Sequence, residues 1–179
     1  MPLTKIQSLG ITDGTIVNAD INASAAITAS KLAAGTSGNG PAFSAYQSAD
    51  TTISNTTSTK IQFNTEEFDT ASCYDNATNY RFTPNVSGYY QINTSGNFGQ
   101  GTGWCQVLIY KNGSSVKDTS QPNGSSGNGN LFYGISALIY MNGTTDYLEV
   151  YAWQSSGGTL TFYGRQNSTF FQASLVRIA

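Results

Sequence analysis

The sequence contains no histidine and only two cysteines among its 179 residues. Histidine supplies the imidazole of the common hydrolase triads and a usual ligand of zinc, so its absence excludes these sites. Charge is also scarce, because 8 basic and 10 acidic residues make up 10% of the chain, against about 25% in an average globular domain. So few basic residues, scattered along the chain, form no nucleic-acid footprint. We therefore expect no enzyme, no cofactor and no nucleic-acid partner.

Long hydrophobic runs are missing as well. No stretch approaches the 18 apolar residues of a membrane-spanning helix. The first residues, MPLTK, lack the basic region and apolar stretch of a classical signal peptide. The sequence therefore predicts neither membrane insertion nor secretion by that route.

Small polar residues and aromatics fill the chain instead. Ser, Thr, Asn and Gly account for 78 of the 179 residues, while aromatics remain at 12%, with 11 Tyr and 9 Phe. Disordered chains are poor in aromatics and usually strongly charged, so most of this chain is expected to fold. The length suits one domain with an appendage.

Residues 1–40 form a separate N-terminal segment, which contains no aromatic residue. Its apolar positions follow one another at steps of five or six residues, which fits neither a helix nor a strand; they are Ile11, Ile16, Ile21, Ile27 and Leu32. Several chains wrapped around one axis could bury one such side chain per layer. A flexible leader with accidental spacing and a helix over residues 25–34 are the alternatives. The glycine-rich stretch 35–41 then predicts a hinge.

From residue 41 onward the sequence predicts short β-strands separated by Gly, Asn and Ser. Residues 90–94 alternate and place Tyr90, Ile92 and Thr94 on one face. Residues 106–110 are continuously apolar, which is typical of a strand covered on both sides. Asn112-Gly113 and Asn142-Gly143 both have the composition of a hairpin turn. Eight to ten such strands predict an antiparallel sandwich.

Two small sets of polar residues could carry chemistry. Cys73 and Cys105 are expected to be free, partly buried thiols, or a disulfide if the fold brings them together. The acidic group Glu66, Glu67 and Asp69 is expected to be solvated. Calcium binding there, or at Asp75 or Asp146, is a weaker alternative because a hard-cation site needs several converging oxygens. No metal site is predicted.

Residues 74–90, YDNATNYRFTPNVSGYY, carry a resemblance to a known family. A Tyr-Asp pair, an aromatic-Thr-Pro strand end and Gly-Tyr-Tyr at the next strand are similar to the globular head of complement component 1q, a relative of the tumour necrosis factor fold. Residues 42–45, 61–64, 107–113, 142–148 and 169–175 agree with further elements in order. The resemblance covers residues 41–179. It implies a ten-stranded jelly roll that forms a compact trimer, with its termini at one end and loops at the other.

The sequence departs from this pattern at two places. Ala173 stands where the family usually has Gly, and Thr144-Thr145 lengthens the usual Gly-Asp turn. The collagen-like stalk of many relatives is absent, because there is no Gly-X-Y repeat. Residues 14–21 and 26–32 instead look like the shaft or anchor segments of bacteriophage fibre and spike proteins.

Surplus aromatic side chains also favour self-association, since exposed apolar area often marks an interface. The candidates for the trimer interface are Tyr89, Tyr151, Trp153, Tyr163 and Phe171. Polar loops with nearby aromatics suit sugars or proteins as ligands. The candidates for such contacts at the apical end, away from the leader, are Trp104, Asn123, Asn128 and Phe132.

These features together predict a virion structural protein. It would be a trimeric fibre or spike knob, with residues 1–40 as anchor to other virion proteins and residues 41–179 as knob contacting a host surface glycan or protein. It would be assembled in the host cytoplasm and lie on the tail or the capsid. The alternatives are a capsid decoration protein without receptor role and a secreted ligand or adhesin of the same fold.

Overall fold

The structure is a computed structural model that describes residues 40–122 and 131–179. The apolar series of the leader and the positions Asn123 and Asn128 lie outside the described residues. The first strand begins at Ala42, and the division of the chain between residues 40 and 41 remains a prediction.

The described chain is an all-β antiparallel sandwich, as predicted. One sheet contains β1 (Ala42–Tyr46), β2 (Thr51–Ile53), β4 (Thr65–Asp69), β7 (Gly88–Phe98), β10 (Leu131–Met141), β12 (Leu160–Phe162) and β13 (Phe170–Ile178). The other contains β3 (Thr59–Lys60), β5 (Tyr74–Asp75), β6 (Arg81–Phe82), β8 (Trp104–Lys111), β9 (Ser114–Pro122) and β11 (Leu148–Gln154). The described residues thus hold thirteen strands, where ten were predicted, and five of the thirteen have only two or three residues.

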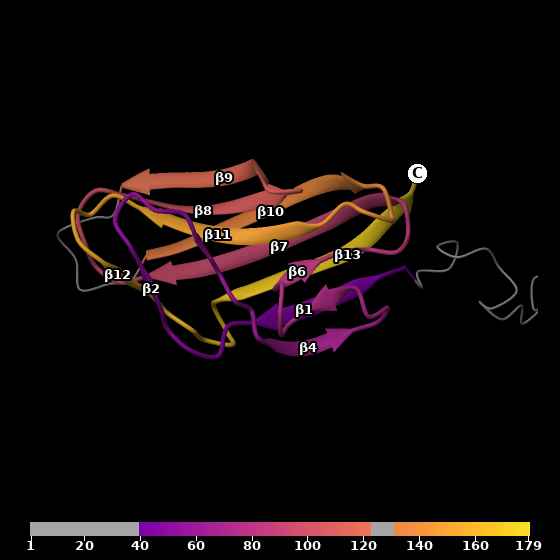
Figure 1. Ribbon diagram of the computed structural model, residues 1–179, viewed down its shortest axis with the longest axis horizontal. Helices are drawn as coiled ribbons and strands as arrows, with labels where there is room; N and C mark the ends of the chain where they lie inside the picture. Colours follow the sequence, from indigo (N-terminus) through magenta and orange to yellow (C-terminus); the bar gives the residue numbers. More distant parts are fainter. Residues whose placement is uncertain (1–39, 123–130) are drawn as a thin grey trace, which may run out of the picture.

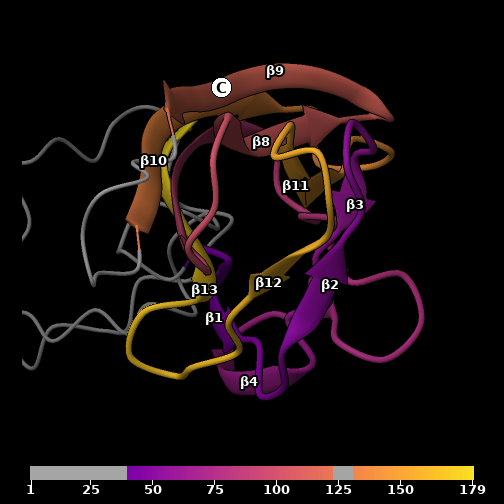
Figure 2. The same ribbon diagram turned by 90° about the vertical axis from the view of Figure 1, so that its left-hand side faces the viewer.

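The seven-stranded sheet is built around β7. This strand pairs along its whole length with β10 on one side and, over residues 88–95, with β13 on the other. β1 lies between β13 and β4, and the short strands β12 and β2 extend the sheet at one end. In the six-stranded sheet, β8 lies between β9 and β11, and β11 also pairs with β3 and β6. The two sheets face each other as layers (Figures 1 and 2).

The entry of the knob and its last strand lie at the same end of the sandwich (Figure 1). β1 and β13 are antiparallel neighbours, and the amide of Leu175 donates to the carbonyl of Pro41 at 3.0 Å. We call this the basal end. The opposite end, where β8 and β10 begin, is the apical end.

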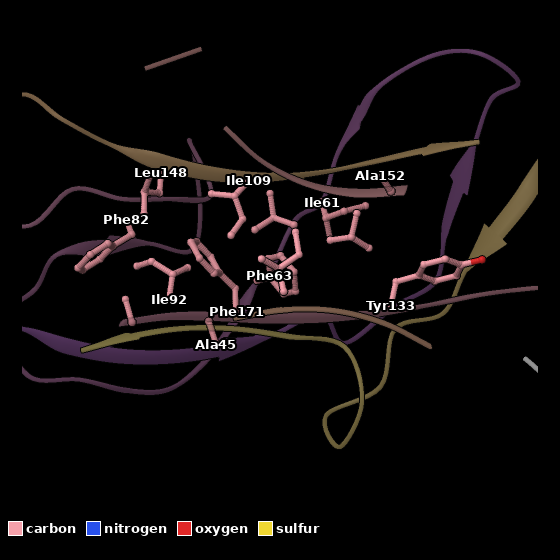
Figure 3. Close-up of a cluster of buried hydrophobic side chains, with 14 of the residues drawn as sticks. Ala45, Ile61, Phe63, Phe82, Ile92, Ile109, Tyr133, Leu148, Ala152 and Phe171 are labelled. Atoms are coloured by element: carbon pink, nitrogen blue, oxygen red, sulfur yellow. The ribbon is translucent and has the colours of Figure 1, made fainter. Parts of the chain in front are cut away.

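Alternating side chains from both sheets fill the space between the layers (Figure 3). Tyr90, Ile92 and Thr94 all point inward, as their alternation predicts. An aromatic cluster centres on Phe43, whose ring lies 4.5 Å from that of Tyr74 and 4.9 Å from that of Phe171. Ile61 and Phe63 are fully buried but belong to the connection between β3 and β4, where a strand over residues 61–64 was expected.

The two Asn-Gly pairs differ in the structure. Asn112 and Gly113 have φ angles of 52° and 80°, and they close the β8–β9 hairpin as predicted. Asn142-Gly143 is not a hairpin turn, because β10 pairs with β7 and β11 pairs with β8. It begins a longer crossover between the sheets, in which the side chain of Asn142 accepts the amides of residues 144–146.

Both cysteines are buried thiols. Burial raises the pKa of the Cys73 thiol. In the part of the chain that the structure describes, no helix is long and apolar enough to cross a bilayer.

Candidate functional site

The outer face of the seven-stranded sheet carries most of the exposed large apolar side chains. Residues with even numbers in β10 and odd numbers in β7 point outward, away from the core. Of the eight exposed large hydrophobic residues described, six belong to this sheet: Phe68, Tyr89, Phe132, Leu138, Tyr140 and Val176. Scattered exposed apolar residues are ordinary, but their concentration on one sheet is typical of a protein–protein interface.

The basal part of this face is aromatic. Tyr89 of β7 and Tyr140 of β10 are register partners, and their ring centroids lie 5.6 Å apart. The ammonium of Lys111 lies 5.5 Å from the centre of the Tyr140 ring and donates to the carbonyl of the same residue. Leu138 and Val176 continue the surface toward β13. We call Tyr89, Leu138, Tyr140 and Val176 the basal patch.

A polar row crosses the same face next to the basal patch. Ser44, Gln172, Asn93 and Ser136 are successive register partners across four strands. Ser44 is buried and donates to Glu67 at 2.6 Å, while its hydroxyl accepts from Gln172 at 3.0 Å. The hydrogen bonds from Ser44 and Gln166 lower the pKa of Glu67. A polar row beside an apolar patch fixes the orientation of a partner better than apolar contacts alone.

Four of the five predicted interface residues fall into three groups. Tyr89 lies on the outer face just described. Tyr151 and Trp153 are partly buried on the outer face of the other sheet, where Tyr110 stacks on Tyr151 at 4.2 Å. Tyr163 follows β12 and lies under the guanidinium of Arg165.

Phe171 is a correction to the predicted interface. Its side chain is fully buried and contacts the rings of Phe43, Phe63 and Tyr74. It therefore has no surface to offer a second subunit. The neighbouring Phe170 points to the opposite face of β13, because side chains alternate along a strand.

A buried carboxylate, that of Glu149, lies on the sheet face that carries Tyr151 and Trp153. The carboxylate of Glu149 is 7% exposed, accepts from Lys60 at 2.6 Å and from the hydroxyl of Tyr151 at 3.2 Å. Burial, followed by the negative charge of Glu149, raises the pKa of Tyr151 to about 12. This hydroxyl is therefore neutral and donates to Glu149 at physiological pH.

At the basal end, a second ion pair anchors the crossover from β10 to β11. Lys111 contacts Asp146 at 2.8 Å, and the side chain of Asn112 donates to the same carboxylate. Burial raises the pKa of Asp146, but hydrogen bonds from Lys111, Asn112 and the amide of Asn142 outweigh it and lower the pKa. The basal loops are thus tied together beside the basal patch.

Four of the five carboxylates considered for calcium, those of Glu67, Asp69, Asp75 and Asp146, accept hydrogen bonds from the chain itself. Asp69 accepts the amides of Ala71 and Tyr74, and Asp75 accepts the amides of residues 77–79. Among the described residues, no group of three or more acidic or cysteine side chains lies close enough together to hold a metal ion.

The apical end carries the other predicted contact residues. Trp104 at the start of β8 is 50% exposed, and Phe132 at the start of β10 is 61% exposed. They lie at the same end of the sandwich but on the outer faces of different sheets. Two hydrogen bonds fix the backbone of Trp104 to Ser155. The amide of Trp104 donates to the hydroxyl of Ser155, and the carbonyl of Trp104 accepts from the amide of Ser155.

Three residues of the basal patch were not predicted from the sequence: Leu138, Tyr140 and Val176. A signal for the first two was present, since residues 131–141 are apolar on both alternating faces. Such a strand has one apolar face in the core and a second apolar face on the surface. The signal for Val176 was absent, because a bulge between Leu175 and Arg177 shifts the alternation of β13.

Comparisons with known proteins agree on the fold. No protein-family model matches the chain, and no curated protein sequence does. Among solved structures, Eiger TNF from S. frugiperda aligns with a TM-score of 0.63 at 10% identity, over 78% of this chain and 95% of that one. The globular domain of zebrafish complement 1qA aligns with a TM-score of 0.55 at 16% identity, over 78% and 99%. The PRD1 vertex protein P5 aligns with a TM-score of 0.54 at 17% identity, over 76% and 97%. The chain therefore has a fold similar to tumour necrosis factor and complement 1q domains, as the motif at residues 74–90 indicates.

Proposed function

We propose that this chain forms a homotrimeric knob on the surface of a virus particle. The observation that carries self-association is the outer face of the seven-stranded sheet, where five of the eight exposed large hydrophobic residues lie in addition to Phe132 at its apical end. Covering such a face removes apolar area from water. This burial favours association by about 25 cal/mol of free energy per Å², before the entropic costs of association are subtracted. The number of three subunits rests on the resemblance to complement 1q and tumour necrosis factor domains.

The position on a particle rests on two further observations. Residues 14–21 and 26–32 are similar to anchor segments of bacteriophage fibre and spike proteins, and one structure of similar fold is a vertex protein. The leader enters the knob at the basal end, so that the apical end points away from the attachment point. Trp104 and Phe132 at that end are proposed to contact a host surface glycan or protein, and no catalytic step is involved.

Light scattering of the purified chain at micromolar concentration tests the assembly. We expect three times the 19.0 kDa mass of one chain. Leu138→Asp places a charge on the outer face and should yield folded monomers, whereas Val116→Asp, on the edge of the other sheet, should leave the trimer intact. A wild-type monomer, or equal effects of both variants, would contradict the proposed interface.

Binding to host and non-host cells tests the role of the knob. We expect the isolated trimer to bind host cells, and Trp104→Ala with Phe132→Ala to reduce this binding without changing the trimer mass. A trimer that incorporates into particles but binds no host cells would favour capsid decoration. Binding to a soluble receptor without any incorporation would favour a secreted ligand.

A further inference from the structure

The outer face of the six-stranded sheet carries both tryptophans of the chain. Trp153 of β11 lies opposite Gln106 of β8 in the strand register, and Trp104 is two residues from Gln106 on the same face of β8. The two tryptophans are therefore diagonal neighbours, whose side chains begin about 7 Å apart. Tyr151 extends the same face by two residues along β11. We call Trp104, Gln106, Tyr151 and Trp153 the aromatic platform.

Contacts within the chain hold this platform in place. The ring of Tyr151 stacks on that of Tyr110 at 4.2 Å, and the hydroxyl of Tyr151 donates to the carboxylate of Glu149. The backbone of Trp104 is fixed by its two hydrogen bonds to Ser155. A surface whose aromatic side chains are already ordered loses little conformational entropy when a ligand binds.

The free polar groups of the platform are neutral. The carboxamide of Gln106 and the indole N–H groups of Trp104 and Trp153 form no hydrogen bond with any residue that the structure describes. The platform thus offers flat apolar rings with neutral donors and an acceptor beside them. A sugar has the matching surface, because its C–H face is apolar and its hydroxyl groups both donate and accept hydrogen bonds.

The charges on this face favour a neutral ligand over an anionic one. Lys60, which lies opposite Tyr151 in the register, is already paired with Glu149 at 2.6 Å. Asp118, opposite Leu108 at the edge of the sheet, is an exposed carboxylate. A phosphate group or a nucleic acid would need unpaired cations here, whereas a sugar hydroxyl can donate to a carboxylate.

We propose that the aromatic platform binds a neutral glycan, with one sugar ring stacked on Trp104, the next on Trp153, and their hydroxyls bonded to Gln106. The inference rests on the proposed contact of Trp104 with a host surface and names the ligand class for it. It needs neither the number of subunits nor the place on a particle. Self-association through the outer face of the seven-stranded sheet leaves the platform uncovered, because the two faces belong to different sheets.

Tryptophan fluorescence of the full-length chain tests the site, because the platform holds the only two tryptophans. The probe is host-cell polysaccharide from which acidic chains have been removed on an anion exchanger. We expect saturable binding to the wild type and at least tenfold weaker binding to Trp153→Ala. Trp104→Ala, at a more exposed position, should show the same loss and serves if Trp153→Ala does not fold.

Tyr147→Ala is the matched control. Tyr147 precedes β11 on the same sheet, six residues from Trp153 and therefore about 20 Å away at the basal end. Its replacement should leave the affinity unchanged. No binding to the wild type, or equal losses in the tryptophan variants and Tyr147→Ala, would overturn the proposal.

Treated host cells separate this inference from the proposed function. Periodate cleaves the vicinal diols of sugars, whereas a protease removes surface proteins. We expect binding of the knob to be lost after periodate and retained on washed, protease-treated cells. The reverse pattern would overturn the glycan and assign the contact to a protein, and the proposed host contact would stand. Binding to the polysaccharide without binding to untreated cells would support the glycan site and contradict the proposed host contact.

Discussion

Gly96 of β7 packs directly against the ring of Phe162 from β12. A Cβ atom at residue 96 would overlap the far edge of that ring, which is fully buried and also contacts Phe98 edge-on at 4.9 Å. The glycine is thus required by packing, since its own backbone conformation is an ordinary extended one. It lets an aromatic side chain from a three-residue strand enter the core at the apical end.

Replacing this glycine should strain the core. We expect Gly96→Ala to lower the free energy of unfolding by about 1–3 kcal/mol, because the Phe162 ring must move in a fully packed site. Chemical denaturation measures the loss. Gly134→Ala in the paired strand is the control, because a Cβ there meets only the carbonyl of Thr94 at an ordinary 3.6 Å. Equal losses in the two variants would refute the packing explanation.

Two neighbouring phenylalanines of β13 should behave differently. Phe171→Ala removes a fully buried ring from the aromatic cluster and should destabilise the fold by about 3–5 kcal/mol. Phe170→Ala, on the opposite face, should cost clearly less. Thermal unfolding and light scattering together separate the roles. Dissociation of a fully stable Phe171→Ala protein would instead support an interface role.

Asp75 should make stability depend on pH in acid. The amides of Thr78 and Ala77, followed by the side chain and amide of Asn79, lower the pKa of Asp75 to about 2 from its ordinary value near 3.8. Its contribution is therefore complete above pH 4 and is lost as the pH falls toward 2. The slope of unfolding free energy against pH should be smaller in Asp75→Asn than in the wild type, and equal slopes in the two proteins would contradict this role of Asp75.

Removing Lys60 or Glu149 from their ion pair should cost different amounts of folding stability. Lys60→Met leaves a buried carboxylate with the hydroxyl of Tyr151 as its remaining donor, and should cost about 1–3 kcal/mol. Glu149→Gln should cost less, because the Lys60 side chain is one third exposed and can hydrate. Urea denaturation ranks the two variants. A larger loss in Glu149→Gln would show that the lysine, not the carboxylate, needs its partner.

Local patterns in the sequence predicted the local structure well. The alternation at residues 90–94 identified the inward face of β7, and Asn112-Gly113 identified a hairpin with two positive φ angles. Both signals act within a few residues, where backbone sterics and side-chain alternation decide the result. The fold class followed from many such signals in succession.

Assignments that depend on pairing between distant strands were less successful. Asn142-Gly143 has the same composition as the hairpin, yet Asp146 and Lys111 direct the chain across to the other sheet. Phe170 and Phe171 are equally apolar, so only the register of β13 with β7 decides which one enters the core. For the same reason Tyr151 was grouped with Tyr89, although the two lie on different sheets.

The position of β1 has a mechanical consequence. Residues 42–46 are hydrogen-bonded to β13 on one side and to β4 on the other, and the chain enters this strand from the basal end, along its axis (Figure 1). A force pulling on Gly40 away from the knob would load both ladders in shear, so that their hydrogen bonds must break together and not one after another. A knob connected in this way is expected to stay folded under a steady pull on its leader that would unzip a peripheral hairpin.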